Sequence, residues 1–222
     1  MNDVTIVFTS CGRFDFLKKT IDSFMSMNTY DIKKIIVIDN SSNKDGFDII
    51  NGMFRKHKVE TQIIINETNI GQVASIDKAY SFVETNYIFH CEDDWIFTKP
   101  NFIEKSLDVL SFDEKISNIN IRYRFNGQRG SMHPINPNPK KTNNGVIYYE
   151  YALNFLNEWH GFSWNPGLRR KSDYDLIKPY KQYVNEQGVG LVYKNLDFKS
   201  ACLEEQYCYH IGGDETTPLA NE

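Results

Sequence analysis

Three consecutive carboxylates, Glu92, Asp93 and Asp94, are the residues best suited to chemistry. An apolar, β-prone run at 87–89 precedes them, and apolar and aromatic residues resume at 95–97. Three adjacent like charges repel one another and add nothing to packing, but a cation held by oxygen ligands would offset that repulsion. Mg²⁺ and Mn²⁺ prefer such ligands and typically bridge protein carboxylates to a substrate diphosphate. The alternative is an acidic, solvated turn after a strand.

The composition restricts the class of protein to which the chain can belong. It has 222 residues, 41% of them hydrophobic and 24% charged, which is typical of one packed domain. Its net charge of -4 argues against nucleic acid as a partner. No apolar stretch is long enough to span a bilayer, so we expect no integral membrane segment. Neither a signal peptide nor a CxxC motif is present, which favours a cytoplasmic protein with reduced thiols and no structural zinc.

Strand and helix patterns alternate through the first hundred residues. Strands are expected at 4–9, 34–39, 61–65 and 87–91, with helices at 14–27, about 47–54 and about 72–83. Buried strands joined by helices predict a parallel sheet that is covered on both faces. Ligands bind such sheets beyond the carboxyl ends of the strands. Polar clusters follow each expected strand there, at 10–13, 39–42, 69–72 and 92–94.

The second half of the chain has a different pattern. A helix at 102–110 and a strand at 116–123 are followed by a long polar stretch at 124–145, which predicts a functional flap or disorder. A β-like segment, an aromatic turn, a helical region and two short strands are expected in order at 146–151, 159–167, 173–187, 198–203 and 207–211. We therefore expect one α/β domain over 1–222.

The order and spacing of five short anchors resemble the GT-A fold of nucleotide-sugar glycosyltransferases, especially the inverting family 2. These anchors are the segments 6–13, 37–42, 69–71, 92–94 and 209–212. The resemblance implies a Rossmann-like, mostly parallel sheet with flanking helices and a smaller acceptor-side region. Residues 1–97 would bind the nucleotide, and 98–222 would bind the acceptor and catalyse. Asn40 and Ser41 depart from the family, which often has Asp and Gly there.

The same resemblance implies a metal site for Mn²⁺ or Mg²⁺. Asp94 would be the direct ligand, and Asp93 and Glu92 would contact the ribose or the donor sugar. His210 matches a late histidine that can complete the metal shell through a neutral ring nitrogen. The alternative for His210 is an ordinary core or surface histidine.

Further residues of the first half match donor-binding positions of the family. Thr9, Arg13 and Asp39 would hold a uridine-type base and its ribose, and Asn69 lies in the turn of the third anchor. Asp39 would otherwise cap the turn after its strand. Arg13 could pair with phosphate or cap its own turn.

An inverting transfer also needs a general base to deprotonate the acceptor hydroxyl. Glu186 is the best-placed carboxylate by resemblance, and an ordinary solvated helix carboxylate is the alternative. Its rivals as the base are Asp173, Asp175, Glu204 and Glu205. Trp164 would form the floor beneath the donor sugar or be buried in the core, and Arg169 could reach the diphosphate or lie on the surface.

The function expected is transfer of a sugar, with inversion, from a nucleotide-diphosphate sugar, preferably UDP-linked, to a glycan or other hydroxyl acceptor. A sugar nucleotidyltransferase would need a Gly-rich loop after the first strand, where this chain has one glycine. A dinucleotide-binding dehydrogenase would need G-x-G-x-x-G, which is absent. A nucleotide-sugar or glycan-binding module without turnover stays open.

Overall fold

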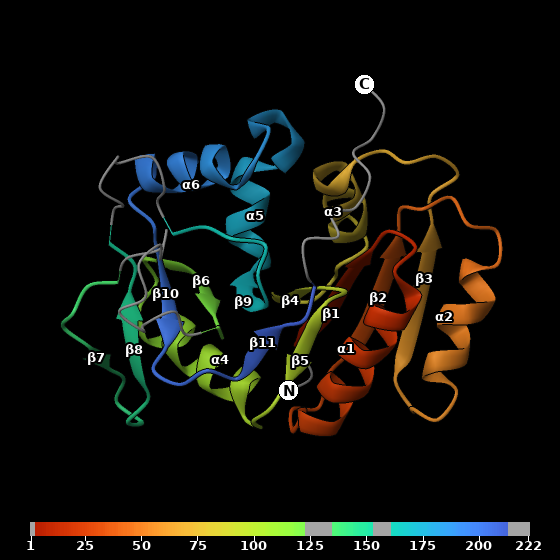
Figure 1. Cartoon of the computed structure of the whole chain (residues 1–222). Helices are drawn as coiled ribbons and strands as arrows, with labels where there is room; N and C mark the ends of the chain where they lie inside the picture. Colours follow the sequence, from red (N-terminus) through yellow and green to blue (C-terminus); the bar gives the residue numbers. More distant parts are fainter. Residues whose placement is uncertain (1–2, 123–134, 153–160, 213–222) are drawn as a thin grey trace.

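The computed structural model describes residues 3–122, 135–152 and 161–212 and shows an α/β fold (Figure 1). One sheet contains nine strands in the order β3-β2-β1-β4-β9-β6-β10-β8-β7, and β11 pairs with β5 in a second, two-stranded sheet. The expected α/β class is confirmed.

The first half of the chain forms the parallel part of the sheet. Parallel pairs join β2 to β3, β1 to β2 and β1 to β4, and a helix follows each of the first three strands, as the alternating pattern predicts. The bounds are β1 Val4–Ser10, α1 Phe14–Met27, β2 Lys34–Asp39, α2 Gly46–Phe54, β3 Glu60–Ile65, α3 Gln72–Tyr80 and β4 Tyr87–Glu92. The carboxyl ends of all four strands therefore meet at one edge.

The second half contains shorter elements. They are β5 Trp95–Phe97, α4 Phe102–Phe112, β6 Ile116–Asn120, β7 Lys140–Lys141, β8 Ile147–Glu150, β9 Gly167–Arg170, α5 Lys171–Ile177, a 3₁₀ turn η1 Tyr180–Tyr183, α6 Glu186–Asn195, β10 Lys199–Leu203 and β11 Cys208–His210. The end of the polar stretch, at 135–145, contains a β-bridge and β7, whereas 123–134 lies outside the described residues.

Two features of this half differ from expectation. The predicted helical region at 173–187 is wrong as one unit, because it divides into α5, η1 and the start of α6. Pro179 lacks an N–H donor and disfavours helical geometry at Lys178, so α5 ends there. The strand β9 was also unforeseen, and it lies antiparallel between β4 and β6. Gly167 permits this pairing, because a Cβ there would lie 2.4 Å from the Ile119 carbonyl oxygen.

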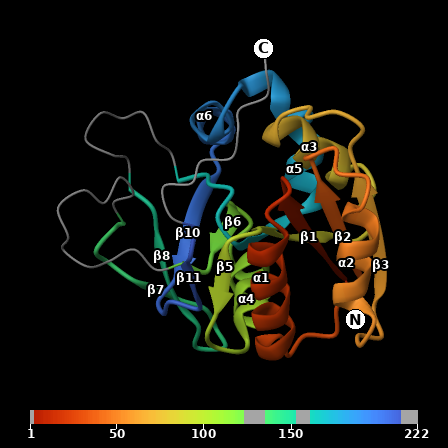
Figure 2. The ribbon, with the colours of Figure 1, turned by 45° about the vertical axis from the view of Figure 1, so that its right-hand side comes forward.

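The strands carry apolar side chains to both faces of the sheet. Along β1, Ile6 and Phe8 belong to one core cluster and Val7 to the other, which is the alternation expected of a strand. The first cluster packs beneath α1, α2 and α4, and the second packs beneath α3, α5 and α6 (Figures 1 and 2). Burial on both faces accounts for the nearly continuous apolar runs that make these strands recognisable.

Candidate functional site

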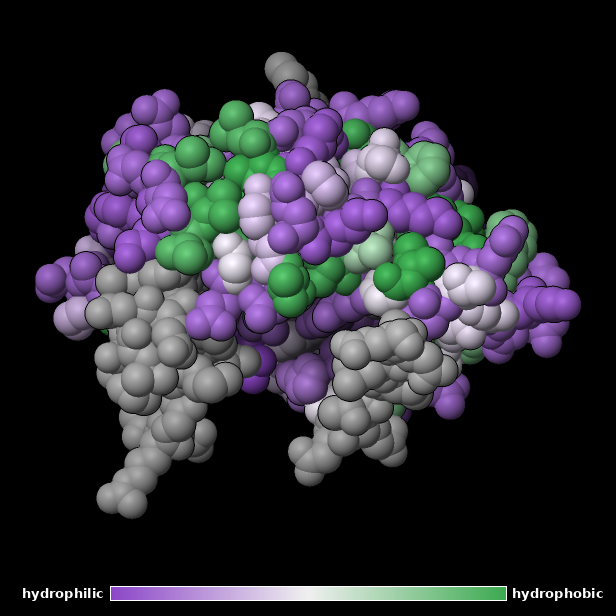
Figure 3. Space-filling view, turned by 90° about the horizontal axis from the view of Figure 1, so that it is seen from above, coloured by the Kyte–Doolittle hydropathy of each residue, from purple (hydrophilic) through white to green (hydrophobic). Residues whose placement is uncertain are grey.

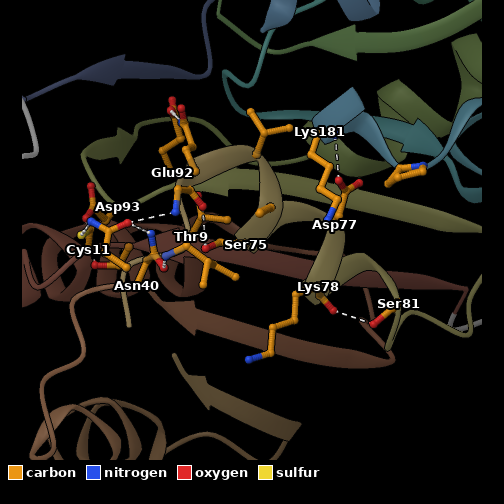
Figure 4. A pocket seen from close by; sticks show the side chains of 18 of the residues that line it. Thr9, Cys11, Asn40, Ser75, Asp77, Lys78, Ser81, Glu92, Asp93 and Lys181 are labelled. Atoms are coloured by element: carbon orange, nitrogen blue, oxygen red, sulfur yellow. Dashed lines mark hydrogen bonds between the residues drawn. The ribbon is translucent and has the colours of Figure 1, made fainter. Parts of the chain in front are cut away.

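A pocket of about 1450 Å³ opens at the edge where the four parallel strands end. Each of the four polar clusters contributes to its lining, through residues such as Arg13, Asn40, Asn69 and the acidic triplet, and Thr9 of β1 lines it as well. Figure 4 shows Thr9, Asn40, Glu92 and Asp93 together in the pocket. A cavity of this size admits a ligand as large as a nucleotide sugar. The sequence prediction of a site at this edge thus agrees with the position of the pocket.

The acidic turn after β4 is held in place from two neighbouring elements. The Ser10 hydroxyl at the end of β1 donates to Asp93 Oδ2 at 2.9 Å. Thr20 of α1 donates its hydroxyl to the Asp93 carbonyl oxygen at 2.6 Å and accepts from the Trp95 N–H at 2.9 Å. Because Thr20 is fully buried, these hydrogen bonds are shielded from water and fix the backbone on either side of Asp94.

Arg13 neutralises part of the charge of this turn. Its guanidinium lies 3.3 Å from Asp93 Oδ1 and 2.8 Å from Asp94 Oδ2, and it stacks 4.7 Å from the centre of the Phe16 ring. The turn at the start of α1 therefore places a cation against the carboxylates. Arg13 occupies the N-cap position of α1, although its side chain makes no capping hydrogen bond, and its pairing with a phosphate stays a prediction.

The small second sheet brings the chain end to the acidic turn. The strand β11 pairs antiparallel with β5, with His210 opposite Trp95, and the Ile211 N–H donates to the Asp94 carbonyl at 2.9 Å. His210 Nε2 then lies 3.0 Å from Asp94 Oδ2. Two residues that are 116 positions apart in sequence are thus adjacent, as the resemblance implied.

Burial and mutual repulsion perturb two of the carboxylates. Burial, followed by the charges of Asp94, Glu186 and Asp93, raises the pKa of the half-buried Glu92 to about 8. Burial raises the pKa of Asp93 to about 6, although Arg13 and Ser10 oppose this shift. A second cation at this turn would relieve the same repulsion.

The Asp94 carboxylate is suited to bind a metal ion. Its Oδ1 is buried and makes no hydrogen bond within the described part of the chain. Among the described residues no group of three or more His, Cys, Asp and Glu side chains is arranged to hold an ion. Mg²⁺ and Mn²⁺ commonly take one or two protein ligands and complete their shell with water and substrate phosphates, so Asp94 and His210 suit such a partial shell.

Asp39 and two asparagines, Asn40 and Asn69, make hydrogen bonds where β1 and β2 end at the pocket. Asp39 is fully buried and accepts hydrogen bonds from the N–H groups of Gly12 and Ser41, at 2.8 and 3.0 Å, and from the Ser41 hydroxyl. The turn-capping alternative is therefore present in the structure, and a direct nucleotide contact of Asp39 stays a prediction. Asn40, the residue that departs from the family, donates to Asn69 Oδ1 at 2.6 Å.

Glu186 is the first residue of α6, and its side chain turns back towards the loop before β9. Its Oε1 accepts hydrogen bonds from the Trp164 N–H and from the Ser163 hydroxyl, the latter at 3.2 Å. Its charge also contributes to the raised pKa of Glu92, although Glu186 is not among the residues that line the pocket. Glu186 is thus anchored by the neighbouring loop, unlike an ordinary solvated helix carboxylate.

Trp164 and Arg169 lie away from the pocket lining. Trp164 is 4% exposed and packs against His90 and Phe162, so the buried-core alternative describes it. Arg169 is 2% exposed, donates to the Ser163 carbonyl at 3.3 Å and lies over the Phe162 and Trp164 rings. Of the two alternatives for Arg169, the surface position is wrong, and a contact with a diphosphate would require the side chain to leave the core. The first two residues of the aromatic turn expected at 159–167 lie outside the described residues.

Sequence reasoning missed Thr20 and Arg122, and it placed Gln72 in the polar cluster at 69–72 without giving it a role of its own. Gln72 donates to Glu92 Oε1 at 2.8 Å, and Arg122 lies 5.0 Å from the centre of the Trp95 ring. Thr20 falls on the apolar stripe of its helix, between Leu17 and Ile21. A lone hydroxyl on such a stripe is a signal that would have identified it.

Comparison with known proteins connects this geometry to one family. A family model described as glycosyl transferase family 2 matches residues 5–177. An uncharacterized glycosyltransferase of Methanocaldococcus jannaschii is 33% identical over 101 residues, which are 46% of this chain and 34% of that protein. The chain therefore spans about a third of this curated relative.

Solved structures share the fold at low sequence identity. A mannosyltransferase of Pyrobaculum calidifontis in complex with GDP-Man and Mn²⁺ has a TM-score of 0.71 at 8% identity, covering 96% of this chain and 58% of that one. S. aureus TarS with UDP-GlcNAc has a TM-score of 0.67 at 12% identity, covering 96% and 60%. GalNAc-T7 with UDP, GalNAc and Mn²⁺ has a TM-score of 0.71 at 12% identity, covering 97% and 45%. The fold is that of the GT-A glycosyltransferases.

Proposed function

Because this chain belongs to glycosyl transferase family 2, we propose that it transfers a sugar from a nucleotide-diphosphate sugar to a hydroxyl acceptor. The proposal includes dependence on Mn²⁺ or Mg²⁺ and inversion at the anomeric carbon. A UDP-linked donor is the first choice, and the solved relatives that bind GDP-Man or UDP-GlcNAc support testing both nucleotides. No helix among the described residues is long and apolar enough to cross a membrane.

The observation that carries this proposal is the meeting of Asp94, His210 and Arg13 at the pocket edge. Asp94 Oδ2 lies 2.8 Å from Arg13 and 3.0 Å from His210, while its Oδ1 is buried and has no hydrogen-bond partner among the described residues. A divalent ion bound by Asp94 and His210 would stabilise the negative charge that develops on the leaving diphosphate. Arg13 supplies a second positive charge on the same side.

The two halves of the chain would divide the work, 1–97 binding the nucleotide and 98–222 binding the acceptor and catalysing. In the first half, Thr9, Asp39 and Asn69 would define the base and ribose end, with Asp39 acting through the turn it caps. Glu92 and Asp93 would face the ribose or the donor sugar. The asparagine contact between Asn40 and Asn69 would hold this end rigid when the nucleotide arrives.

In the second half, Glu186 would accept the proton of the acceptor hydroxyl. Two donors on one oxygen fix the orientation of its carboxylate, which a general base requires. Attack from the side opposite the diphosphate would invert the anomeric centre. Trp164 and Arg169 would support the loop that orients Glu186 from within the core.

The test is turnover with a panel of UDP- and GDP-sugars, each with Mn²⁺ and with EDTA, followed by release of nucleoside diphosphate and NMR of the product anomer. Metal-dependent release with an inverted product supports the proposal. A retained anomer contradicts the mechanism. Release of pyrophosphate from a nucleoside triphosphate and a sugar phosphate would instead identify a nucleotidyltransferase. Tight metal-dependent nucleotide binding without any turnover would identify a binding module.

A further inference from the structure

Val184, two residues before Glu186, has a backbone conformation that valine rarely adopts. Its φ is 70° and its ψ is -49°, and the Asn185 N–H donates to the Tyr183 carbonyl at 2.8 Å across it. This is a γ-turn of the positive-φ type, which is rare and strained. A β-branched residue at positive φ is a genuine outlier, since its side chain crowds its own backbone. Glycine would adopt the same turn without that cost.

The residues around Val184 hold the turn in place. The Tyr183 carbonyl packs against Gly188, where an added Cβ would lie 2.1 Å from the carbonyl oxygen. Asn185 caps α6 by accepting from the Gly188 N–H at 2.9 Å, and Glu186 is fixed to the loop at Ser163 and Trp164. Strain persists where surrounding structure over-determines it, and such positions concentrate at functional sites.

The turn presents its side chain to the pocket. Val184 lines the pocket and is 79% exposed, the largest fraction among the exposed large hydrophobic residues that the structure describes. Ile70, on the loop before α3, lines the same pocket and is 41% exposed. Seen from above, the face over α3, α5 and α6 mixes hydrophobic and hydrophilic side chains (Figure 3). Val184 and Ile70 are thus apolar side chains at the rim of a pocket whose lining also includes charged residues such as Asp77 and Lys181, and each can pack against an apolar group of a ligand.

We propose that Val184 is a specificity-determining residue that contacts an apolar aglycone of the acceptor. This rests on the proposed function: the turn directly precedes Glu186 in the chain, so an acceptor whose hydroxyl reaches Glu186 would lie close to it. Val184 at the pocket rim would therefore contact the aglycone of the acceptor and not its reacting hydroxyl. Glycine at this position would relieve the strain of the turn, but only a residue such as valine supplies an apolar side chain for the contact.

The experiment compares hexyl with methyl glycosides of glucose, galactose, mannose and N-acetylglucosamine. Their binding to the protein saturated with UDP or GDP and Mn²⁺ is measured by ligand-observed NMR, which needs no turnover. The wild type is expected to bind at least one hexyl glycoside about tenfold more tightly than its methyl counterpart, as burying a valine-sized apolar group allows. Val184→Ala and Val184→Gly should lose most of that preference.

Two further measurements separate loss of the apolar contact from relief of the strained turn. Val184→Gly should raise the unfolding temperature by about 2–4 °C because it relieves the turn, whereas Val184→Ala keeps most of the strain. Ile49→Ala removes another exposed aliphatic side chain, on α2 and outside the pocket, and should change neither aglycone preference nor nucleotide binding.

The inference is overturned if the wild type shows no preference for any hexyl glycoside, or if both Val184 variants retain the preference. An unchanged or lowered unfolding temperature of Val184→Gly overturns the strain argument. Either result can occur while metal-dependent nucleotide binding and donor turnover are intact, so the proposed function is tested separately.

Discussion

Replacing Thr20 by valine tests whether α1 positions the acidic turn. Valine has nearly the same shape as threonine, so the packing of this fully buried position is retained. What disappears is the hydroxyl that donates to the Asp93 carbonyl at 2.6 Å and accepts from the Trp95 N–H at 2.9 Å. The substitution therefore isolates two hydrogen bonds on either side of Asp94.

The size of the effect follows from these two bonds. Loss of the hydroxyl leaves two buried backbone groups, the Asp93 carbonyl and the Trp95 N–H, without their partner, which costs about 1–3 kcal/mol of unfolding free energy per group. The sum, lessened by the more apolar side chain, is about 2–4 kcal/mol of unfolding free energy. Thr20→Ser is the matched control, because it keeps the hydroxyl and loses one methyl group, at about 1 kcal/mol.

Urea unfolding and calorimetric titration of UDP with Mn²⁺ measure the two consequences. Thr20→Val should be less stable than Thr20→Ser and should also bind UDP with Mn²⁺ at least tenfold more weakly at a temperature where it is folded. A stability within about 0.5 kcal/mol of wild type would refute the hydrogen-bond argument. Lost stability with unchanged metal-dependent affinity would refute the link between the turn and the site.

The remaining predictions concern the two ends of the site. Gly212→Ala places a Cβ 2.3 Å from Asp94 Oδ2, so metal-dependent nucleotide affinity should fall at least tenfold in calorimetry. Gly52→Ala on α2 meets nothing within 4 Å and should leave affinity unchanged while stabilising the fold by about 0.5–1 kcal/mol in urea. Glu186→Gln should lower kcat by about 10²–10⁴-fold with donor binding retained, and wild-type turnover would move the base to Asp173 or Asp175. Ser163→Ala removes one of the two described donors to Glu186 Oε1, so kcat should fall less than in Glu186→Gln, and the KM for the donor should not change. An equal loss of kcat in the two variants would contradict this prediction.

Local patterns account for what the sequence predicts well. The strands β1, β2 and β4 are short β-branched or aromatic runs, so their composition identifies them, and α1 has apolar residues at helical spacing, so its periodicity identifies it. Parallel strands end at one edge, which is why four separate polar clusters indicated a single site. These predictions need no knowledge of distant contacts.

Distant contacts explain what the sequence leaves out. The four residues of β9 include Arg169 and Arg170, and nothing local shows that they insert antiparallel between β4 and β6. Arginine is rarely fully buried, so the core position of Arg169 beneath the loop at Ser163 contradicts its usual behaviour. In the sequence Thr20 resembles an ordinary core residue of α1, and only the folded structure shows its hydrogen bonds to the acidic turn. Each of these positions depends on tertiary packing that overrides the local pattern.

The most direct measurement of the proposed metal-dependent donor binding is calorimetric titration of UDP and GDP into wild type and Asp94→Asn, each with Mn²⁺ and with EDTA. Asparagine keeps the shape of Asp94 and an oxygen for Arg13, and it removes the charge that a divalent ion requires. Wild type should bind at least one of the nucleotides much more tightly with Mn²⁺ than with EDTA, and Asp94→Asn, shown to be folded by circular dichroism, should lose that difference. Equal Mn²⁺-dependent affinity in the two proteins would contradict the assignment of Asp94 as the metal ligand.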